Sequence, residues 1–195
     1  MRLFYQSLGV TRRSGSGPYA QKLSALLAGA VSPGSTVEVH GLSEGRAIAD
    51  QYRYLEYLDT AEILENGLRA EREGYDAFLI GNIFEPGLHA LRELLNIPVL
   101  GLCEASVFLA CLMGASFSVV NVNPKFTRRV TENIASYGLA GRLVSIDQMP
   151  SSARRYSIAL SKTRPSAPAS STSFARRHGR ALRKAPKPSF RPAGS

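Results

Sequence analysis

The most informative part of the sequence is residues 75–123, which read YDAFLIGNIFEPGLHALRELLNIPVLGLCEASVFLACLMGASFSVVNVN. Short apolar runs in this segment alternate with longer stretches in which apolar residues recur every three or four positions. Short runs bounded by turn residues predict buried strands, and the longer stretches predict helices. This alternation is typical of a parallel sheet covered by helices. The segment therefore predicts an α/β fold.

The same alternation runs through residues 1–150. It predicts six strands, over residues 3–7, 36–42, 77–81, 98–102, 117–122 and 143–146. It predicts five helices, over residues 18–30, 54–73, 86–95, 104–113 and 125–137. The third helix is expected to have Pro86 in its first turn, and the fifth to end at Gly138 with Arg128 and Arg129 facing solvent. The helix over 104–113 is apolar all round, so it and the strand after it are predicted to be buried.

The charge of the chain is divided unevenly between two regions. Residues 1–150 contain all 15 acidic residues and 13 of the 24 Lys and Arg, a net charge of −2, whereas residues 151–195 carry +11. The second region is rich in Ser, Pro, Ala and Arg, so we expect a basic, disordered segment outside the fold. Its few aromatic residues argue against specific nucleic-acid binding. A shifted reading frame would give the same composition, and this alternative stays open.

Cysteine content and hydropathy indicate a reduced, cytoplasmic protein. The chain has two cysteines, Cys103 and Cys111, too few for a disulfide framework, and its first residues lack the apolar core of a signal peptide. Residues 105–122 are free of charge, but Gly114 and its small or polar neighbours interrupt them, so we expect no membrane partner.

Several local motifs have both a functional and a structural interpretation. The loop over residues 9–17 could bind an anion through Arg12 or Arg13, but its spacing departs from that of a dinucleotide loop paired with Glu38. The three histidines share no ligand spacing, so no metal site is predicted. Cys103 lies where a strand meets a helix, which can lower the pKa of a thiol, although buried cysteines are more often inert.

Asn82 is the polar residue whose position is most indicative of binding. It follows the predicted strand over residues 77–81, and ligands of open α/β sheets bind at the carboxyl ends of strands. Asparagine is also a common turn residue. Both interpretations stay open from spacing alone.

The quoted segment resembles the aspartate/glutamate/hydantoin racemase superfamily. The shared features, in order, are the strand that closes at Asn82, then Glu85-Pro86-Gly87-Leu88, then Ile97-Pro98-Val99 with Gly101, Cys103-Glu104-Ala105 and Phe117-Ser118-Val119-Val120, with Tyr137-Gly138-Leu139 beyond. The resemblance implies two pseudo-symmetric α/β lobes with the site between them. It also implies cofactor-independent isomerase chemistry, in which one cysteine from each lobe moves a proton at the substrate carbon.

The sequence departs from this pattern at both cysteines. Asn82 occupies the position of the first family cysteine, and an amide is not a competent base. No match to the second, which follows residue 145 in the family, is found, and Cys103 does not align with either. We therefore expect a shortened racemase-like protein that lacks the two-thiol mechanism.

The resemblance and the strand ends together give the predicted organisation and site. Residues 1–150 are expected to form the racemase-like region, with a first lobe over about 1–96 and a partial second lobe over about 97–150. A small carboxylate or hydantoin-like ligand is expected between the lobes, and a homo-oligomer stays open. The predicted binding residues are Ser7, Asn82, Ile83, Asn121 and Val122. The competing hypothesis is a non-enzymatic accessory factor whose basic segment engages a partner.

Overall fold

The computed structural model describes residues 1–10, 18–43 and 51–150. The chain divides into two units, Met1–Lys162 and Thr163–Ser195, and all described residues belong to the first. The expectations for Arg12, Arg13 and residues 151–195 therefore lie outside the described residues. No helix in the described ranges combines the length and the apolar character needed to cross a membrane.

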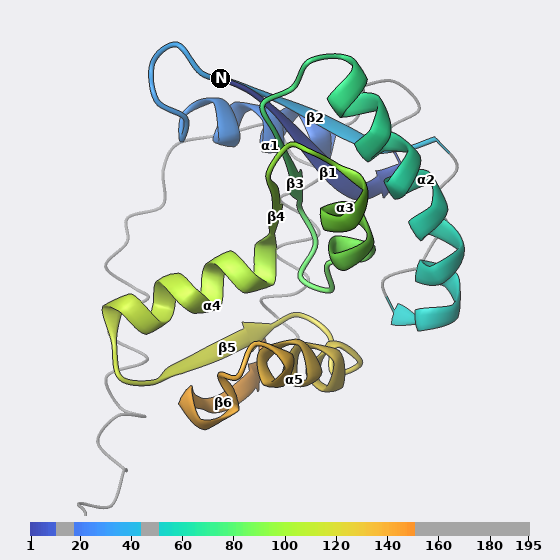
Figure 1. Cartoon of the computed structure of the whole chain (residues 1–195). Coiled ribbons are helices and arrows are strands. Elements are labelled where there is room, and N and C mark those ends of the chain that lie inside the picture. The colour runs from blue at the N-terminus through green and yellow to red at the C-terminus, as the bar shows by residue number, and fades with distance from the viewer. Residues whose placement is uncertain (11–17, 44–50, 151–195) are drawn as a thin grey trace, which may run out of the picture. The chain divides into compact units, whose positions relative to one another are not determined.

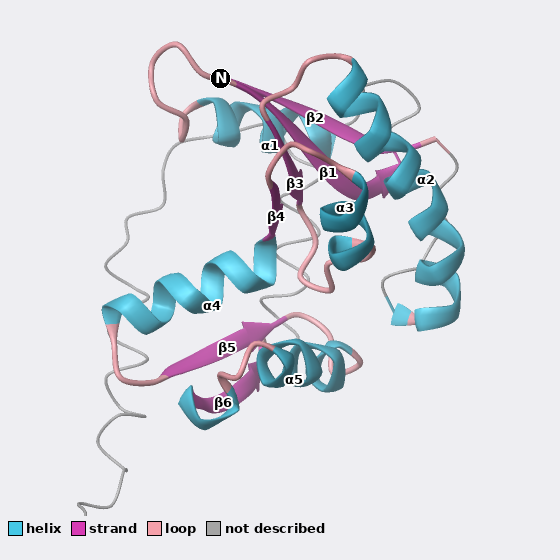
Figure 2. Ribbon diagram, viewed as in Figure 1, coloured by secondary structure: helices cyan, strands magenta, loops and turns pink. Residues whose placement is uncertain are grey.

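All six predicted strands and all five predicted helices are present (Figure 2). The strands are β1 (Arg2–Val10), β2 (Thr36–Leu42), β3 (Ala77–Ile80), β4 (Val99–Gly101), β5 (Phe117–Asn121) and β6 (Leu143–Gln148). The helices are α1 (Pro18–Ala28), α2 (Arg53–Arg72), α3 (Leu88–Leu94), α4 (Leu102–Met113) and α5 (Phe126–Ser136), with a short 3-10 turn over Ala140–Arg142. Helix α5 stops as predicted, because Gly138 has a positive φ of 74° just beyond it.

The first sheet has the strand order β2-β1-β3-β4, and all its neighbouring strands are parallel (Figure 1). Parallel strands bring all their carboxyl ends to one edge of the sheet. The prediction of an α/β fold with parallel sheets is confirmed. Strand β4 pairs with β3 and so belongs to the first sheet, although it follows the lobe boundary proposed near residue 96.

Helices α2 and α3 cover one face of this sheet. Alternate residues of β1 and β3, Phe4, Phe78 and Ile80, are almost fully buried against Ile63 of α2 and Leu91 of α3. Burying side chains of this size stabilises the fold by roughly 1.5–3 kcal/mol each. Helix α1 packs against β2. These contacts hold the strands, and therefore their carboxyl ends, in fixed positions.

The second sheet pairs β5 with β6 in parallel, and α4 and α5 form its core. Val107 of α4 and Val130 and Ile134 of α5 are buried there, with Phe117 and Val119 of β5 packed against them. Apolar residues on the remaining surfaces are exposed, among them Leu112 at 85% and Val120 at 55%. The prediction that α4 and β5 are buried is therefore wrong. Each is covered on one side only by described residues.

Two further local predictions are wrong. Helix α3 begins at Leu88 rather than at Pro86, because Glu85 and Gly87 adopt positive φ values of 54° and 79° and form a turn. Arg128 faces solvent with 89% of its side chain exposed, but only 12% of the Arg129 side chain is exposed. Arg129 contacts Glu56 of α2, a partner that lies far away in the sequence.

Candidate functional site

Strand β3 ends beside Gln6 of β1, and β1 continues from there to Val10. The register pairs Gln6 with Ile80, and the backbone N–H of Gly81 donates to the carbonyl of Gln6 at 2.8 Å. Beyond this pair, Ser7 lies within β1, where its register with β2 shifts between Gln6 and Val10, and Asn82 lies in the loop after β3. The Ser7 hydroxyl is buried and accepts a hydrogen bond from the N–H of Gly9 at 3.1 Å. The structure thus places Ser7 one residue beyond the Gln6–Ile80 pair, within β1, and Asn82 two residues beyond it, in the loop after β3.

Tyr5 belongs to the same strand ends, although the sequence analysis did not identify it. Its hydroxyl donates to the carbonyl of Gly81 at 3.5 Å, and a Cβ at Gly81 would overlap the Tyr5 ring. Burial, and then the nearby Tyr19, raise the pKa of Tyr5, so its hydroxyl stays protonated. Its position two residues before Ser7, on the same face of the strand, was the available signal.

The loop after β3 is fixed by its own hydrogen bonds. The Oδ1 atom of Asn82 accepts the N–H of Phe84 at 2.8 Å, and the carbonyl of Ile83 accepts Nδ2 of Asn133 at 3.1 Å. Both interpretations of Asn82, as a turn residue and as a binding residue, therefore stand. Its side-chain oxygen stabilises the turn, and its NH2 group can donate a hydrogen bond to a ligand. An amide donor here suits a ligand carbonyl or carboxylate.

Asn121 ends β5 in the second sheet and carries a buried acceptor. The residue is 7% exposed, and its Nδ2 atom donates to Oγ1 of Thr127 at 3.1 Å. Within the described residues its Oδ1 atom has no hydrogen-bond partner. A buried polar atom without a partner costs roughly 1–3 kcal/mol, so this oxygen is suited to receive a ligand donor. The following residue, Val122, is 44% exposed.

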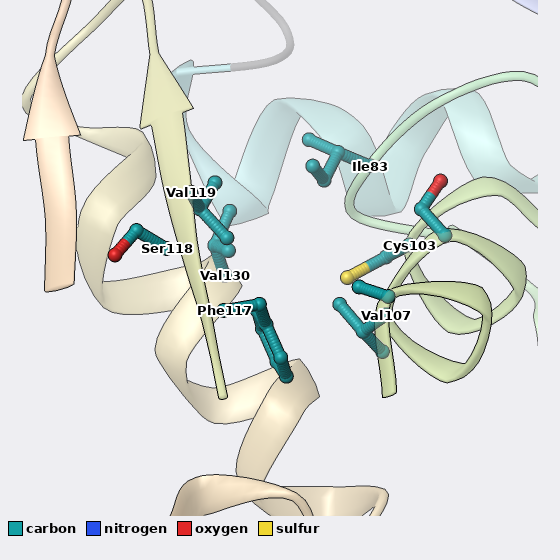
Figure 3. A pocket seen from close by; sticks show the side chains of 9 residues that line it. Ile83, Cys103, Val107, Phe117, Ser118, Val119 and Val130 are labelled. Atoms are coloured by element: carbon teal, nitrogen blue, oxygen red, sulfur yellow. The ribbon is translucent and has the colours of Figure 1, made fainter. Parts of the chain in front are cut away.

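A cavity of about 200 Å³ lies beside this face of β5 (Figure 3). Val119, on the same face of the strand as Asn121, and Phe117 line it together with Ile83 and Cys103. In Figure 3 Ile83 and Cys103 lie across the cavity from Phe117 and Val119. The structure therefore places the loop after β3 opposite the β5 face that bears Asn121.

Cys103 is not activated in this environment. The thiol is 1% exposed, and burial, followed by the charges of Glu85 and Glu104, raises its pKa to about 12. Of the two interpretations of Cys103, the inert buried thiol therefore fits this environment, and the lowered pKa does not. A carboxylate, described next, already occupies the amino end of this helix. Cys111 is also a free thiol and is half-buried.

Glu85 joins the loop after β3 to both helices of the second sheet. Its Oε1 atom accepts the N–H of Glu104 at 2.8 Å at the start of α4, and its Oε2 atom accepts the hydroxyl of Tyr137. Burial raises the pKa of Glu85, while these two hydrogen bonds act in the opposite direction. Gly101 makes room for the carboxylate, since a Cβ there would overlap it.

A metal site is not formed by these residues. Glu85 and His89 are four residues apart, a spacing that would suit two metal ligands on one helix. Glu85 lies in the turn before α3, however, so the two do not form such a pair. No cluster of three or more potential ligands occurs among residues 1–10, 18–43 and 51–150.

The chain also has relatives of known family. Residues 8–186 match the family model described as Asp/Glu/Hydantoin racemase. The matched range extends into the basic segment, residues 151–195, whose composition differs from that of residues 1–150.

Curated relatives are hydantoin racemases. The chain is 41% identical over 106 residues to the hydantoin racemase of Pseudomonas sp. (strain NS671), covering 54% of this chain and 42% of that protein. It is 33% identical over 117 residues to the hydantoin racemase of Paenarthrobacter aurescens, covering 60% of this chain and 49% of that protein. The chain thus spans about half the length of these two relatives.

Solved structures show the same fold. The allantoin racemase from Klebsiella pneumoniae matches with a TM-score of 0.65 and 21% identity, over 94% of this chain and 69% of that one. The allantoin racemase from Pseudomonas fluorescens matches with a TM-score of 0.64 and 21% identity, over 94% and 72%. The resemblance found in residues 75–123 is confirmed by these matches together. The chain belongs to the Asp/Glu/hydantoin racemase family.

Proposed function

We propose that this chain binds a small hydantoin-like or carboxylate ligand at the carboxyl ends of β3 and β5 and at the neighbouring part of β1. The binding residues proposed are Ser7, Asn82, Ile83, Asn121 and Val122. Family membership supports a ligand of this class, and the strand ends are where open α/β sheets bind ligands. The observation that carries the proposal is the buried Oδ1 of Asn121, which has no partner among the described residues.

The hydrogen-bonding groups at these strand ends favour a hydantoin-like ring over a simple carboxylate. The NH2 group of Asn82 is a donor and suits a ligand carbonyl. The Oδ1 atom of Asn121 is an acceptor and suits a ligand N–H. A hydantoin ring carries both carbonyl and N–H groups, whereas a carboxylate offers acceptors only. A hydantoin ring therefore satisfies both sides of the proposed site.

The proposed function is ligand recognition without proton transfer by two thiols. Moving a proton at a carbon between two faces requires two acid–base groups. Asn82 cannot accept a proton, and burial keeps Cys103 in its thiol form, with a pKa of about 12. The proposal requires no cofactor, in keeping with the cofactor-independent chemistry that the family resemblance implies.

Calorimetric titration of the full chain with a 5-substituted hydantoin tests the proposal. We expect saturable binding, with affinity reduced about tenfold in S7A, in N82A and in N121L, because each loses a hydrogen bond to the ligand. The matched variants S32A and N96A change exposed residues away from these strand ends and should bind as the wild type does.

Two results would contradict this proposal. Equal affinities across all five variants would place the ligand elsewhere, and absence of saturable binding would remove the ligand class. In the same samples in D2O, nuclear magnetic resonance should show no deuterium exchange at C5 of the hydantoin above the rate in buffer. Faster exchange would show that the chain has another proton-transfer route.

Three accompanying predictions stay proposals. The racemase-like region is proposed to have a first lobe over about residues 1–96 and a second over about 97–150, with β4 of the second range pairing into the first sheet, followed by the basic segment. A cytoplasmic location is supported by the two free thiols, and cell fractionation would check it. The chain is predicted not to bind nucleic acid specifically.

The accessory-factor alternative is not favoured, because the relatives named above are racemases.

A further inference from the structure

We propose that Arg129 of α5 is a positioning residue that holds the loop of residues 82–84, and with it the groups that would contact a ligand. The part of this proposal that concerns binding rests on the proposed function. Residues 82–84 contain Asn82 and Ile83, and neither residue touches Arg129 in the contacts of the described chain. Arg129 acts on them through the third residue of the loop, Phe84.

Arg129 is held in a fixed place by Glu56. The guanidinium forms an ion pair with the Glu56 carboxylate of α2, and the two side chains are only 12% and 11% exposed. A buried charge without its partner is costly, so the guanidinium is confined to this position. Because α2 packs on the first sheet, Arg129 ties a helix of the second sheet to the framework of the first.

The same guanidinium lies over the ring of Phe84. Its central carbon is 3.8 Å from the ring centroid, and Phe84 is 6% exposed. A cation–π contact away from water is stronger than one at an exposed site. The ring of Phe126, also in α5, meets Phe84 edge to face at 4.9 Å. Phe84 is therefore fixed by two residues of one helix.

A second contact from α5 fixes the neighbouring residue of the loop. Asn133, one turn after Arg129 on the same helix face, donates from Nδ2 to the carbonyl of Ile83 at 3.1 Å. The N–H of Phe84 in turn donates to Oδ1 of Asn82. A displacement of Phe84 would therefore move the Asn82 amide and the Ile83 peptide together.

Only arginine suits both contacts at once. A planar guanidinium can stack its face on Phe84 while its edge donates to Glu56, whereas a lysine ammonium is a compact charge that cannot do both. The conservative change R129K thus keeps the charge and removes the stacking geometry. Arg128 provides a matched control, because it is 89% exposed and pairs with Glu132 on the same helix at 2.9 Å.

The experiment compares R129K, R128K and N133A in the full chain. Circular dichroism first establishes that each variant is folded at the working temperature. Titration with a 5-substituted hydantoin should show an affinity about tenfold lower in R129K and in N133A, and within about twofold of wild type in R128K. The amide NMR signals of Phe84 and the side-chain NH2 signals of Asn82 should shift in R129K but not in R128K.

Each outcome decides between positioning and a purely structural role. If R129K is less stable than wild type but binds with unchanged affinity and unshifted Asn82 signals, the proposal is overturned. If R129K does not fold, F84L decides by the same two measurements, since it removes the ring beneath the guanidinium and keeps the ion pair of Arg129 with Glu56. If the wild type itself does not bind the hydantoin, the proposed function fails, and the Asn82 and Phe84 signals alone then support or overturn positioning.

Discussion

The two sheets of this protein differ in how completely their apolar residues are covered. In the first sheet Phe4 and Phe78 are fully buried beneath α2 and α3. In the second, α4 and α5 bury one face, while Val120 of β5 and Val144 of β6 remain 55% and 69% exposed (Figure 1). Strands of similar composition therefore have different surroundings. The solvent exposure of an apolar strand is therefore decided by the elements that pack on it and not by the strand's own residues.

Truncating one leucine in each region should give the largest difference. Leu91 of α3 is fully buried in the core of the first sheet, whereas Leu112 of α4 is 85% exposed. We expect L91A to lower the free energy of unfolding by roughly 2–5 kcal/mol, through lost burial and a residual cavity. The same change at Leu112 should alter it by less than about 0.5 kcal/mol. Urea denaturation of both variants measures the comparison, and equal losses would show that α4 is covered after all.

Adding one methyl group should give a smaller difference between the regions. A Cβ at Gly101, at the end of β4, would overlap the Glu85 carboxylate, whereas Gly141, in the turn before β6, has open space around it. We expect G101A to destabilise the fold by about 1–3 kcal/mol, since Glu85 must shift and give up its bond to the start of α4. G141A should be nearly neutral. Thermal unfolding would check the pair, and a neutral G101A would contradict the capping role of Glu85.

The smallest effect should be a dependence on pH that belongs to the first sheet. His40 stacks on Phe4 with ring centroids 3.8 Å apart, and burial, with a further contribution from Arg69, lowers the pKa of His40. Between its folded pKa and the unfolded value of about 6.5, the unfolded chain binds more protons. The free energy of unfolding should therefore fall as the pH drops below about 6.5.

Urea denaturation between pH 5 and 8 would measure this dependence in two matched variants. In H40Q, the free energy of unfolding should fall less than in the wild type between about pH 6.5 and the folded pKa of His40. H89Q, which changes an exposed histidine on α3, should follow the wild type. A decline that persists unchanged in H40Q would assign it to other groups.

Local patterns were sufficient to predict much of the fold. All six strands and five helices occur where apolar periodicity, turn residues and Gly138 predicted them. The parallel α/β class followed from their alternation, and the racemase resemblance followed from motifs over residues 75–139. These features depend on backbone preferences and on neighbours along the chain, which the sequence displays directly.

The candidate site was predicted in part. Asn82 could be named because it follows the carboxyl end of β3, whereas Ser7 lies within β1, which continues to Val10 beyond its last pair with β3. Tyr5 was missed, because nothing in its own segment shows that the ring lies over Gly81. The two interpretations of Cys103 could not be separated from the sequence, because its raised pKa comes from burial and then from Glu85, which lies 18 residues earlier in the chain.

Element positions and fold class therefore followed from the order of residues, whereas burial, ion pairing and pKa values required the folded chain. Arg129 shows why. The helix pattern predicted that Arg129 faces solvent together with Arg128. In the fold, Arg129 is instead buried in an ion pair with Glu56, which lies 73 residues earlier in the chain. Solvent exposure and charge depend on groups that folding brings together from distant parts of the sequence, and no local pattern records those neighbours.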